Sequence, residues 1–458
     1  MPSYRCLIMG AAGRDFHDFQ TFFVTHPEFR VCGFTAAQIP FIDARSFPHE
    51  LAGPGYEQDL PIYPEERLAE LIRNLSIDFV FFAYSDLSHE EVMHRASLVQ
   101  AAGAGFALLG PKQTQLTASR PVIAVTAVRT GAGKSPLTQW LARHLRSRSV
   151  RPGVIRHPMP YGNLRDQRVQ HFETVADLDR FRCTIEERED YEPYLEEGIP
   201  VFAGVRYAVI LDVAGRQSDV ILWDGGNNAT PFVRPDLWIV VADGLRPGHE
   251  TTYYPGETNF RSADVIVISK ASAASPESLQ KIRTHANSLN PDAAIIEADL
   301  VLTCDDEEQL RGRHVLVIED GPTLTHGGMA SGAGMEVAGR SGVASIVDPR
   351  HHAVGTIAET LKAFPHLGPV LPACGYSDEQ IRDLSETICR SDAEIVIDGS
   401  PARLERLLEI PQRIVNVRYR FEQRSGPDLA GLVSDRLTTW AAEREGETDE
   451  SDHSQHGV

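Results

Sequence analysis

The hydrophobic pattern of the chain consists of short apolar runs that alternate with amphipathic stretches. In its middle part, Val- and Ile-rich runs fall at residues 153–156, 219–224, 236–242, 264–269, 293–297 and 314–319. Runs of this length between Gly, Pro and polar clusters predict buried strands. Residues 205–217 carry Val209, Ile210 and Val213 at helical spacing and therefore predict a helix. Strands that alternate with helices in this way predict a parallel sheet of the α/β class.

Similar but smaller patterns flank this middle part. Near the N-terminus, strands are expected at 5–9, 79–83 and 106–109 and helices at 66–75 and 90–102, which predicts a Rossmann-like domain. Gly10 and Gly13 follow its first strand, but no acidic residue ends a second strand convincingly, which favours a scaffold without ligand over a dinucleotide site. Gly110-Pro111 and Pro121 punctuate the exit from this domain.

The C-terminal pattern predicts strands near 344–347, 394–397 and 413–419 and helices near 353–364, 377–389, 400–408 and 427–443. From Glu443 the chain is acidic and polar without an apolar period, which is typical of disorder. We therefore expect an N-terminal Rossmann-like domain at 1–118, a central parallel-sheet domain at 119–340, a smaller C-terminal α/β region at 341–442 and a disordered tail at 443–458.

Charge and composition narrow the class of protein. The formal net charge of -20 argues against general binding to nucleic acid or to membrane surfaces, since both need a positive field. No apolar run approaches the roughly 18 residues that span a bilayer. The 6 cysteines are scattered without metal-like pairing. These features predict a cytoplasmic protein whose anionic ligands would bind at a local basic site.

The stretch from Val122 to Ser135 carries the most specific signal. An apolar run passes into Thr130, Gly131, Ala132, Gly133, Lys134 and Ser135, and an amphipathic segment follows. Strand, glycine-rich turn and helix form a phosphate-binding loop whose N–H groups, lysine and hydroxyl hold a nucleotide with Mg²⁺. Val128 replaces the first glycine of the usual motif, and Arg129 stands five places before the lysine, as in the signal-recognition and MinD-like NTPases. A glycine-rich turn without ligand is the alternative, which the context disfavours.

Two later strand ends complete the predicted nucleotide site. Residues 219–223 lead into Asp224, a carboxylate placed to hold Mg²⁺ together with Ser135; the alternative is an aspartate that caps a turn. Residues 264–268 lead into Ser269 and Lys270, where related NTPases carry Asn-Lys beneath the purine. Lys270 either covers the base with its aliphatic stem or is an ordinary strand-end lysine.

Three loops gather basic residues or bare glycine backbone at further strand ends, where α/β sheets bind ligands. Their candidate substrate-binding residues are Arg156 and His157, Arg246, and His326, Gly327 and Gly328. In so acidic a chain such places predict a phosphate site. The alternative is that they are hinge loops.

Several of these loops together resemble one family. Residues 156–162 (RHPMPYG), 221–228 (ILWDGGNN) and 319–329 (EDGPTLTHGGM) are similar to motifs of the cyclic 2,3-diphosphoglycerate synthetases, as are the length and three-part organisation. The resemblance implies closure of an intramolecular phosphoanhydride in 2,3-diphosphoglycerate with ATP and Mg²⁺. Lys134 and Asp224 would act on the transferred group, Arg156 and His157 on the substrate, and Arg129 within its own subunit or across a homodimer. A GTPase-type switch or metallochaperone and a small-molecule kinase remain alternatives of the same P-loop class.

Overall fold

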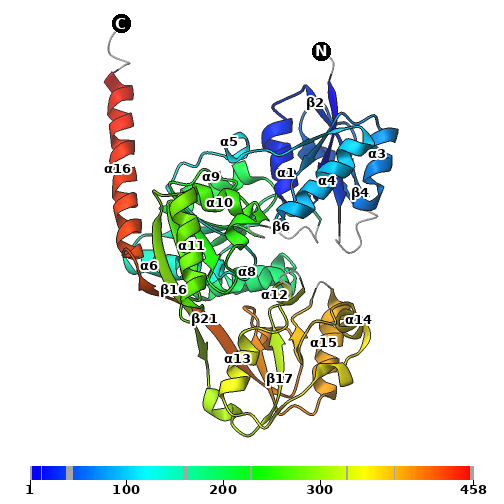
Figure 1. Cartoon of the computed structure of the whole chain (residues 1–458), viewed down its shortest axis with the longest axis vertical. Coiled ribbons are helices and arrows are strands. Elements are labelled where there is room, and N and C mark those ends of the chain that lie inside the picture. The colour runs from blue at the N-terminus through cyan, green and yellow to red at the C-terminus, as the bar shows by residue number, and fades with distance from the viewer. Residues whose placement is uncertain are drawn as a thin grey trace.

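A computed structural model describes residues 3–11, 13–37, 45–157, 163–226, 229–325, 329–375 and 377–453. It shows a mixed α/β architecture in which an N-terminal part, a central part and a C-terminal part follow one another along the chain (Figure 1). The central part holds the phosphate loop, and the other two parts border it.

The N-terminal part is a parallel sheet with one antiparallel edge strand. Its strand order is β3-β4-β2-β1-β5-β7. The sequence predicts such a Rossmann-like arrangement, and the phenylalanine-rich core of this part lies under its short helices. The strands are β1 (Tyr4–Met9), β2 (Phe29–Ala36), β3 (Ser46–Phe47), β4 (Leu60–Pro64), β5 (Phe79–Phe82) and β7 (Gly105–Ala107); the helices are α1 (Arg14–Asp18), α2 (His49–Ala52), α3 (Leu68–Asn74), α4 (His89–Ala102) and α5 (Pro111–Thr114), with a π-helical turn η1 (Phe19–Phe23) and a 3₁₀ turn η3 (Glu65–Arg67).

The central part is built on strands in the order β10-β11-β9-β12-β8-β13-β15-β16. All of these neighbours are parallel except β10 and β11. The strands are β8 (Val122–Ala127), β9 (Pro152–Arg156), β10 (Gln170–Phe172), β11 (Val201–Ala203), β12 (Val220–Asp224), β13 (Leu237–Asp243), β15 (Val265–Ser269) and β16 (Ala294–Cys304); the helices are α6 (Lys134–Ser147), α7 (Val175–Arg180), α8 (Ile185–Glu196), α9 (Tyr207–Gln217), α10 (Gly256–Ser262) and α11 (Pro276–Leu289), with η4 (His249–Thr251). Because β8 lies between β12 and β13, the loops after these three strands meet at one edge of the sheet.

A long strand connects the central and C-terminal parts. β21 (Arg413–Ser425) pairs antiparallel with β16 and parallel with β20 (Ile395–Gly399), which continues to β17 (His314–Glu319), β18 (Ser345–Ile346) and β19 (Leu371–Pro372). Around this smaller sheet lie α12 (Gly321–Thr325), α13 (Ala333–Arg340), α14 (Gly355–Ala363) and α15 (Asp378–Arg390), and the turns η5 (Glu307–Leu310), η6 (Pro349–His351) and η7 (Leu404–Arg406). The last helix, α16 (Leu429–His453), returns to the central core through Leu429 and Val433.

A two-stranded ribbon joins the N-terminal part to the central part. β6 (Leu87–Ser88) pairs antiparallel with β14 (Tyr253–Tyr254). Ser88 also caps α4, because its hydroxyl accepts from Glu91 N and the Glu91 carboxylate accepts from the Ser88 backbone. The loop that precedes this ribbon is thereby fixed against the edge of the central sheet.

The structure corrects three sequence expectations. The boundary at residue 340 is misplaced, since β17 and α13 pack with the C-terminal core rather than with the central one. The expected helix at 400–408 is only the 3₁₀ turn η7, because the Arg403 N–H donates to Glu192 of α8 (3.1 Å) instead of starting a helical ladder. The tail expected to be disordered from Glu443 is helical as far as His453, since α16 continues without a proline to end it.

Candidate functional site

The phosphate loop has the geometry that its sequence predicts. β8 ends at Ala127, and α6 begins at Lys134 directly after Gly133. Gly131 and Gly133 have φ of 77° and 102°, left-handed values that favour glycine. A Cβ on Gly133 would also lie 2.6 Å from Leu300 of β16. The turn is therefore tight, and its N–H groups lie at a helix N-terminus, where a phosphate binds readily.

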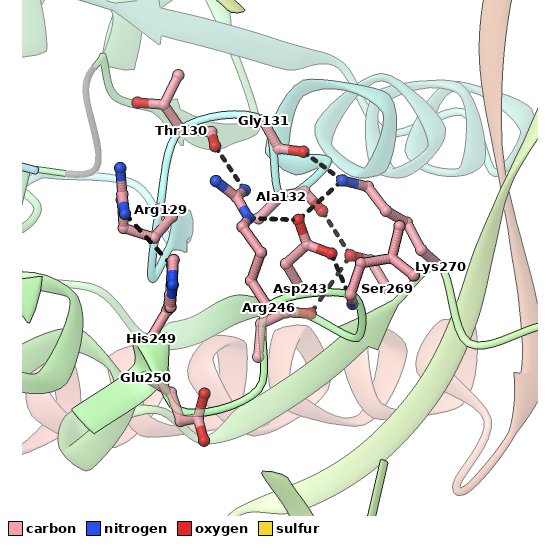
Figure 2. Close-up of polar contacts among 12 residues, drawn as sticks. Arg129, Thr130, Gly131, Ala132, Asp243, Arg246, His249, Glu250, Ser269 and Lys270 are labelled. Carbon is pink, nitrogen blue, oxygen red and sulfur yellow. Dashed lines mark hydrogen bonds and ion pairs between the residues drawn. The ribbon is translucent and has the colours of Figure 1, made fainter. Parts of the chain in front are cut away.

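Residues from two neighbouring strand ends hold the carbonyl side of this loop (Figure 2). The Ser269 hydroxyl donates to Ala132 O (2.6 Å), Lys270 Nζ donates to Gly131 O (2.8 Å), and Arg246 Nη2 donates to Thr130 O (2.6 Å). With three successive carbonyls bonded on one side, the loop is fixed before any nucleotide binds.

Asp243 connects the two cations of this group. It accepts from Arg246 Nε and from Lys270 Nζ, both at 2.8 Å, and is 2% exposed. Burial alone would raise the pKa of Asp243, but Lys270 and Arg246 outweigh it and lower that pKa. Arg246, expected to contact the substrate, thus lies at the phosphate loop beside Lys270, which was expected at the nucleotide.

Arg129 is held by the N-terminal part. Its Nε donates to the Asp86 carboxylate (2.6 Å), its guanidinium carbon lies 3.7 Å from the centre of the Tyr253 ring, and Nη1 is 3.3 Å from His249 Nδ1. Asp86 precedes the ribbon strand β6 and has a positive φ of 62°. Arg129 therefore occupies a defined position beside the loop, with a counter-charge from another part of the chain.

On the other side of the loop, Lys134 and Asp224 form the centre of a buried charged cluster. Lys134 Nζ donates to Asp224 Oδ1 (2.5 Å), and the Tyr194 hydroxyl donates to Oδ2 (2.7 Å). Arg156, 2% exposed, forms ion pairs with both Asp224 and Asp190. Burial would raise the pKa of Asp224, yet Arg156 and Lys134 hold it at about 2. The sequence predicted the lysine, the aspartate and the arginine here, but not Asp190 or Tyr194 of α8.

The remaining predicted residues divide into two groups. His157 lies at the end of β9, where its ring packs edge-on against Phe232 and its carbonyl accepts from Tyr191 (3.3 Å). A Cβ on Gly13 would overlap the His157 ring, so the glycine turn of the N-terminal part lies against this site. The predicted substrate residues His326, Gly327 and Gly328 lie outside the described residues.

The donor set of this site suits Mg²⁺. Ser135 and Asp224 supply a hydroxyl and a carboxylate, the oxygen ligands that Mg²⁺ prefers. Asp224 is bonded to Lys134, whose ammonium group would turn toward nucleotide phosphates. The side-chain types of both residues therefore suit the metal, and the metal site itself stays a prediction.

Comparisons with known proteins decide the family. No protein-family model matches the chain. The sequence is 53% identical over 431 residues to arginine synthetase ArcE of Thermococcus kodakarensis, which covers 94% of this chain and 96% of that protein. The chain belongs to the arginine synthetase family. It is accordingly an enzyme of the synthetase type, as the resemblance to cyclic 2,3-diphosphoglycerate synthetases implied.

More distant relatives share parts of the chain. A cyclic 2,3-diphosphoglycerate synthetase of Rubrobacter xylanophilus is 25% identical over 337 residues, 64% of this chain and 74% of that protein. A tetraacyldisaccharide 4'-kinase of Dechloromonas aromatica is 37% identical over 130 residues, 27% of this chain and 35% of that protein. The resemblance to cyclic diphosphoglycerate synthetases is thus confirmed as a distant relationship, at half the identity found with the arginine synthetase.

One expectation about location can be compared with the described helices. Among them, none combines the length and apolarity that crossing a membrane requires. The cytoplasmic location, the homodimer and the absence of a nucleic-acid partner stay predictions.

Proposed function

We propose that this protein is an ATP-dependent synthetase that forms arginine. The observation that carries the proposal is the 53% identity with an arginine synthetase over 94% of the chain, together with the phosphate loop that precedes α6. Family membership supports the product, and Lys134 with its neighbours supports the use of a nucleoside triphosphate.

The chemistry follows from the product. Arginine differs from its ureido counterpart, citrulline, by a nitrogen in place of the ureido oxygen. That oxygen is a poor leaving group until it carries a phosphoryl group. Transfer of the γ-phosphoryl group of ATP to the ureido oxygen, followed by attack of ammonia and loss of phosphate, gives arginine, ADP and phosphate in balance.

The chain's own residues can assist the phosphoryl step mainly by electrostatics. The N–H groups of residues 130–135 would bind the phosphates, and Lys134 would turn from Asp224 to the transferred group. Ser135 and Asp224 would hold Mg²⁺, which neutralises phosphate charge when bound. Arg129, fixed by Asp86, has its guanidinium at the edge of the loop and would stabilise the departing ADP.

The charges around Arg156 favour a neutral or cationic substrate over 2,3-diphosphoglycerate. The sequence assigned Arg156 to a substrate phosphate, but its guanidinium is buried between Asp190 and Asp224. Glu187, 3% exposed, adds a further carboxyl on the same helix. A polyanion placed here would meet carboxylates, whereas a ureido group that becomes a guanidinium would gain from them.

The test measures products directly. Purified protein with MgATP, ammonium and citrulline should release arginine and free phosphate in equal amounts, read by amino-acid analysis and a phosphate assay. Parallel reactions replace citrulline by 2,3-diphosphoglycerate, and ATP by GTP. A kinase would give ADP without matching phosphate, and a switch protein would hydrolyse nucleotide without needing citrulline. Absence of arginine in the complete mixture would refute the proposal.

A further inference from the structure

Helix α8 lies at the junction of the central and C-terminal parts (Figure 1). Ile185, its first residue, is buried in the C-terminal core, and its N–H donates to Gly375 O (3.3 Å). At the other end of the helix, Glu196 forms ion pairs with Arg403 (2.9 Å) and Arg406 (3.1 Å). The same helix delivers Asp190 and Tyr194 to the phosphate-loop cluster, so its two sides face different parts of the enzyme.

Two buried carboxyl groups at this junction keep oxygens without a hydrogen-bond partner among the described residues. Glu189 is 6% exposed, and within the described residues neither of its oxygens has a hydrogen-bond partner. Asp398, at the end of β20, is 0% exposed, and its Oδ2 likewise has no partner there, while Oδ1 accepts from Ser400. Burying an oxygen without a partner costs free energy, and for Glu189 no hydrogen bond in the described structure offsets that cost.

The electrostatic surroundings of Glu189 are acidic. Burial raises the pKa of Glu189 well above its usual range, and Asp320, Glu186, Asp190 and Asp398 raise it further. Arg418 is the cation that acts on Asp398, but its N–H groups donate to the carbonyls of residues 400 and 417 and to Asn416. The cluster therefore attracts a cation from outside the chain.

The carboxylates at α8 differ from a compact metal site. Among the described residues, only His49, Glu50 and Asp59 bring three possible metal ligands within 4.8 Å of one another, and these lie in the N-terminal part. No such group of three ligands occurs at α8 among the described residues. A planar guanidinium, with N–H donors pointing in several directions, can bridge carboxylates that do not converge on one point.

We infer that Glu189 and Asp398, with Glu186 and Asp320 beside them, bind the guanidinium end of arginine and of the group that becomes it. This rests on the proposed function. The reaction converts a neutral ureido group into a cation, so an anionic site stabilises charge that develops along the reaction. Asp190, the next residue of α8, acts on both Glu189 and Lys134, which connects this site to the phosphoryl-transfer site.

The inference is tested by calorimetric titration of the full-length protein with L-arginine and, separately, with methylguanidinium. Glu189→Gln and Asp398→Asn should each weaken both ligands about tenfold or more, because each removes a charged hydrogen-bond acceptor. The Kd for ATP, measured without arginine or methylguanidinium, should stay unchanged. Glu196→Gln is the matched control, since it removes one charge from the same helix at the same junction and should leave binding unchanged. Thermal melts show whether each variant is folded, and Asp398→Asn keeps the test valid if Glu189→Gln is not.

The outcomes separate the site from the proposed function. Wild-type protein that makes arginine, with folded Glu189→Gln and Asp398→Asn variants that bind methylguanidinium as tightly, would overturn the site and leave the function standing. If binding depends on Glu189 but the wild-type protein makes no arginine, the site stands and the proposed function is refuted. Wild-type protein that binds neither ligand, or that binds ammonium in preference to methylguanidinium, would overturn the inference as well.

Discussion

The buried ion pairs of Asp224 allow a test of how burial changes the contribution of an ion pair to the free energy of unfolding. Asp224→Asn keeps the size of the side chain but removes the charge that faces Lys134 and Arg156. The pKa of Asp224 is held at about 2 against an ordinary 3.8, which corresponds to a few kcal/mol in favour of the ionised form. Loss of one partner of a buried pair costs about 3 to 5 kcal/mol. Since Arg156 keeps Asp190, we expect a cost at or just below the lower end of this range, about 2 to 3 kcal/mol at pH 7.

Asp219, just before the same strand, is the matched control. Its pKa is also lowered to about 2, by a side-chain pair with Arg151, but 38% of its side chain is exposed. Solvent screening reduces such a pair to less than about 1 kcal/mol, so Asp219→Asn should unfold nearly like the wild type. Urea unfolding followed by the fluorescence of Trp140, Trp223 and Trp238 reports on the central part. Equal losses of unfolding free energy in Asp224→Asn and Asp219→Asn would refute the argument that burial makes the difference.

Two further predictions follow from the charged groups of the site. Lys134→Ala should lower arginine formation at least about a hundredfold. Its free energy of unfolding should change by less than about 1 kcal/mol, because Asp224 keeps Arg156 and Tyr194. Lys281→Ala is the control and should keep full activity, whereas an active Lys134→Ala variant would mean that the phosphate loop is not the site of transfer. Burial raises the pKa of Glu319 to about 7, so between about pH 4.5 and 7 the folded state binds more protons than the unfolded state and unfolding free energy should fall as pH rises. Glu319→Gln should flatten this slope in urea titrations at pH 5, 6 and 8, and a slope that stays the same would contradict the assignment.

Strands that are short, apolar and buried could be predicted from the sequence. β8, β9, β12, β13, β15 and β17 all lie within one or two residues of their expected positions, since each is a buried run with a polar or glycine-rich end. β16 and β21 are longer than expected because their outer halves are only partly buried and pair with each other across the chain. A half-buried strand alternates apolar and polar residues and gives a weaker signal.

The candidate site shows a similar limit. Lys134, Asp224, Lys270 and Arg156 follow strands that the sequence reveals, so their meeting at one edge could be foreseen. The positions of Asp190 and Tyr194 could not be foreseen, because the sequence of α8 is acidic, has no apolar period and contains Pro193. Its burial depends on ion pairs, such as that of Glu192 with Arg406, with residues more than two hundred positions away. Pairing over that distance leaves no local pattern.

The position of α8 gives a reason why synthesis would need both ligands at once. Asp190 forms an ion pair with Arg156, which pairs with Asp224, the partner of Lys134. When Lys134 turns to a nucleotide and Asp224 takes up Mg²⁺, the charge that Arg156 shares between Asp224 and Asp190 would be redistributed. Because Asp190 acts on Glu189, the potential at Glu189 would then depend on whether nucleotide is bound. By reciprocity, a guanidinium at Glu189 would change nucleotide binding by the same coupling free energy.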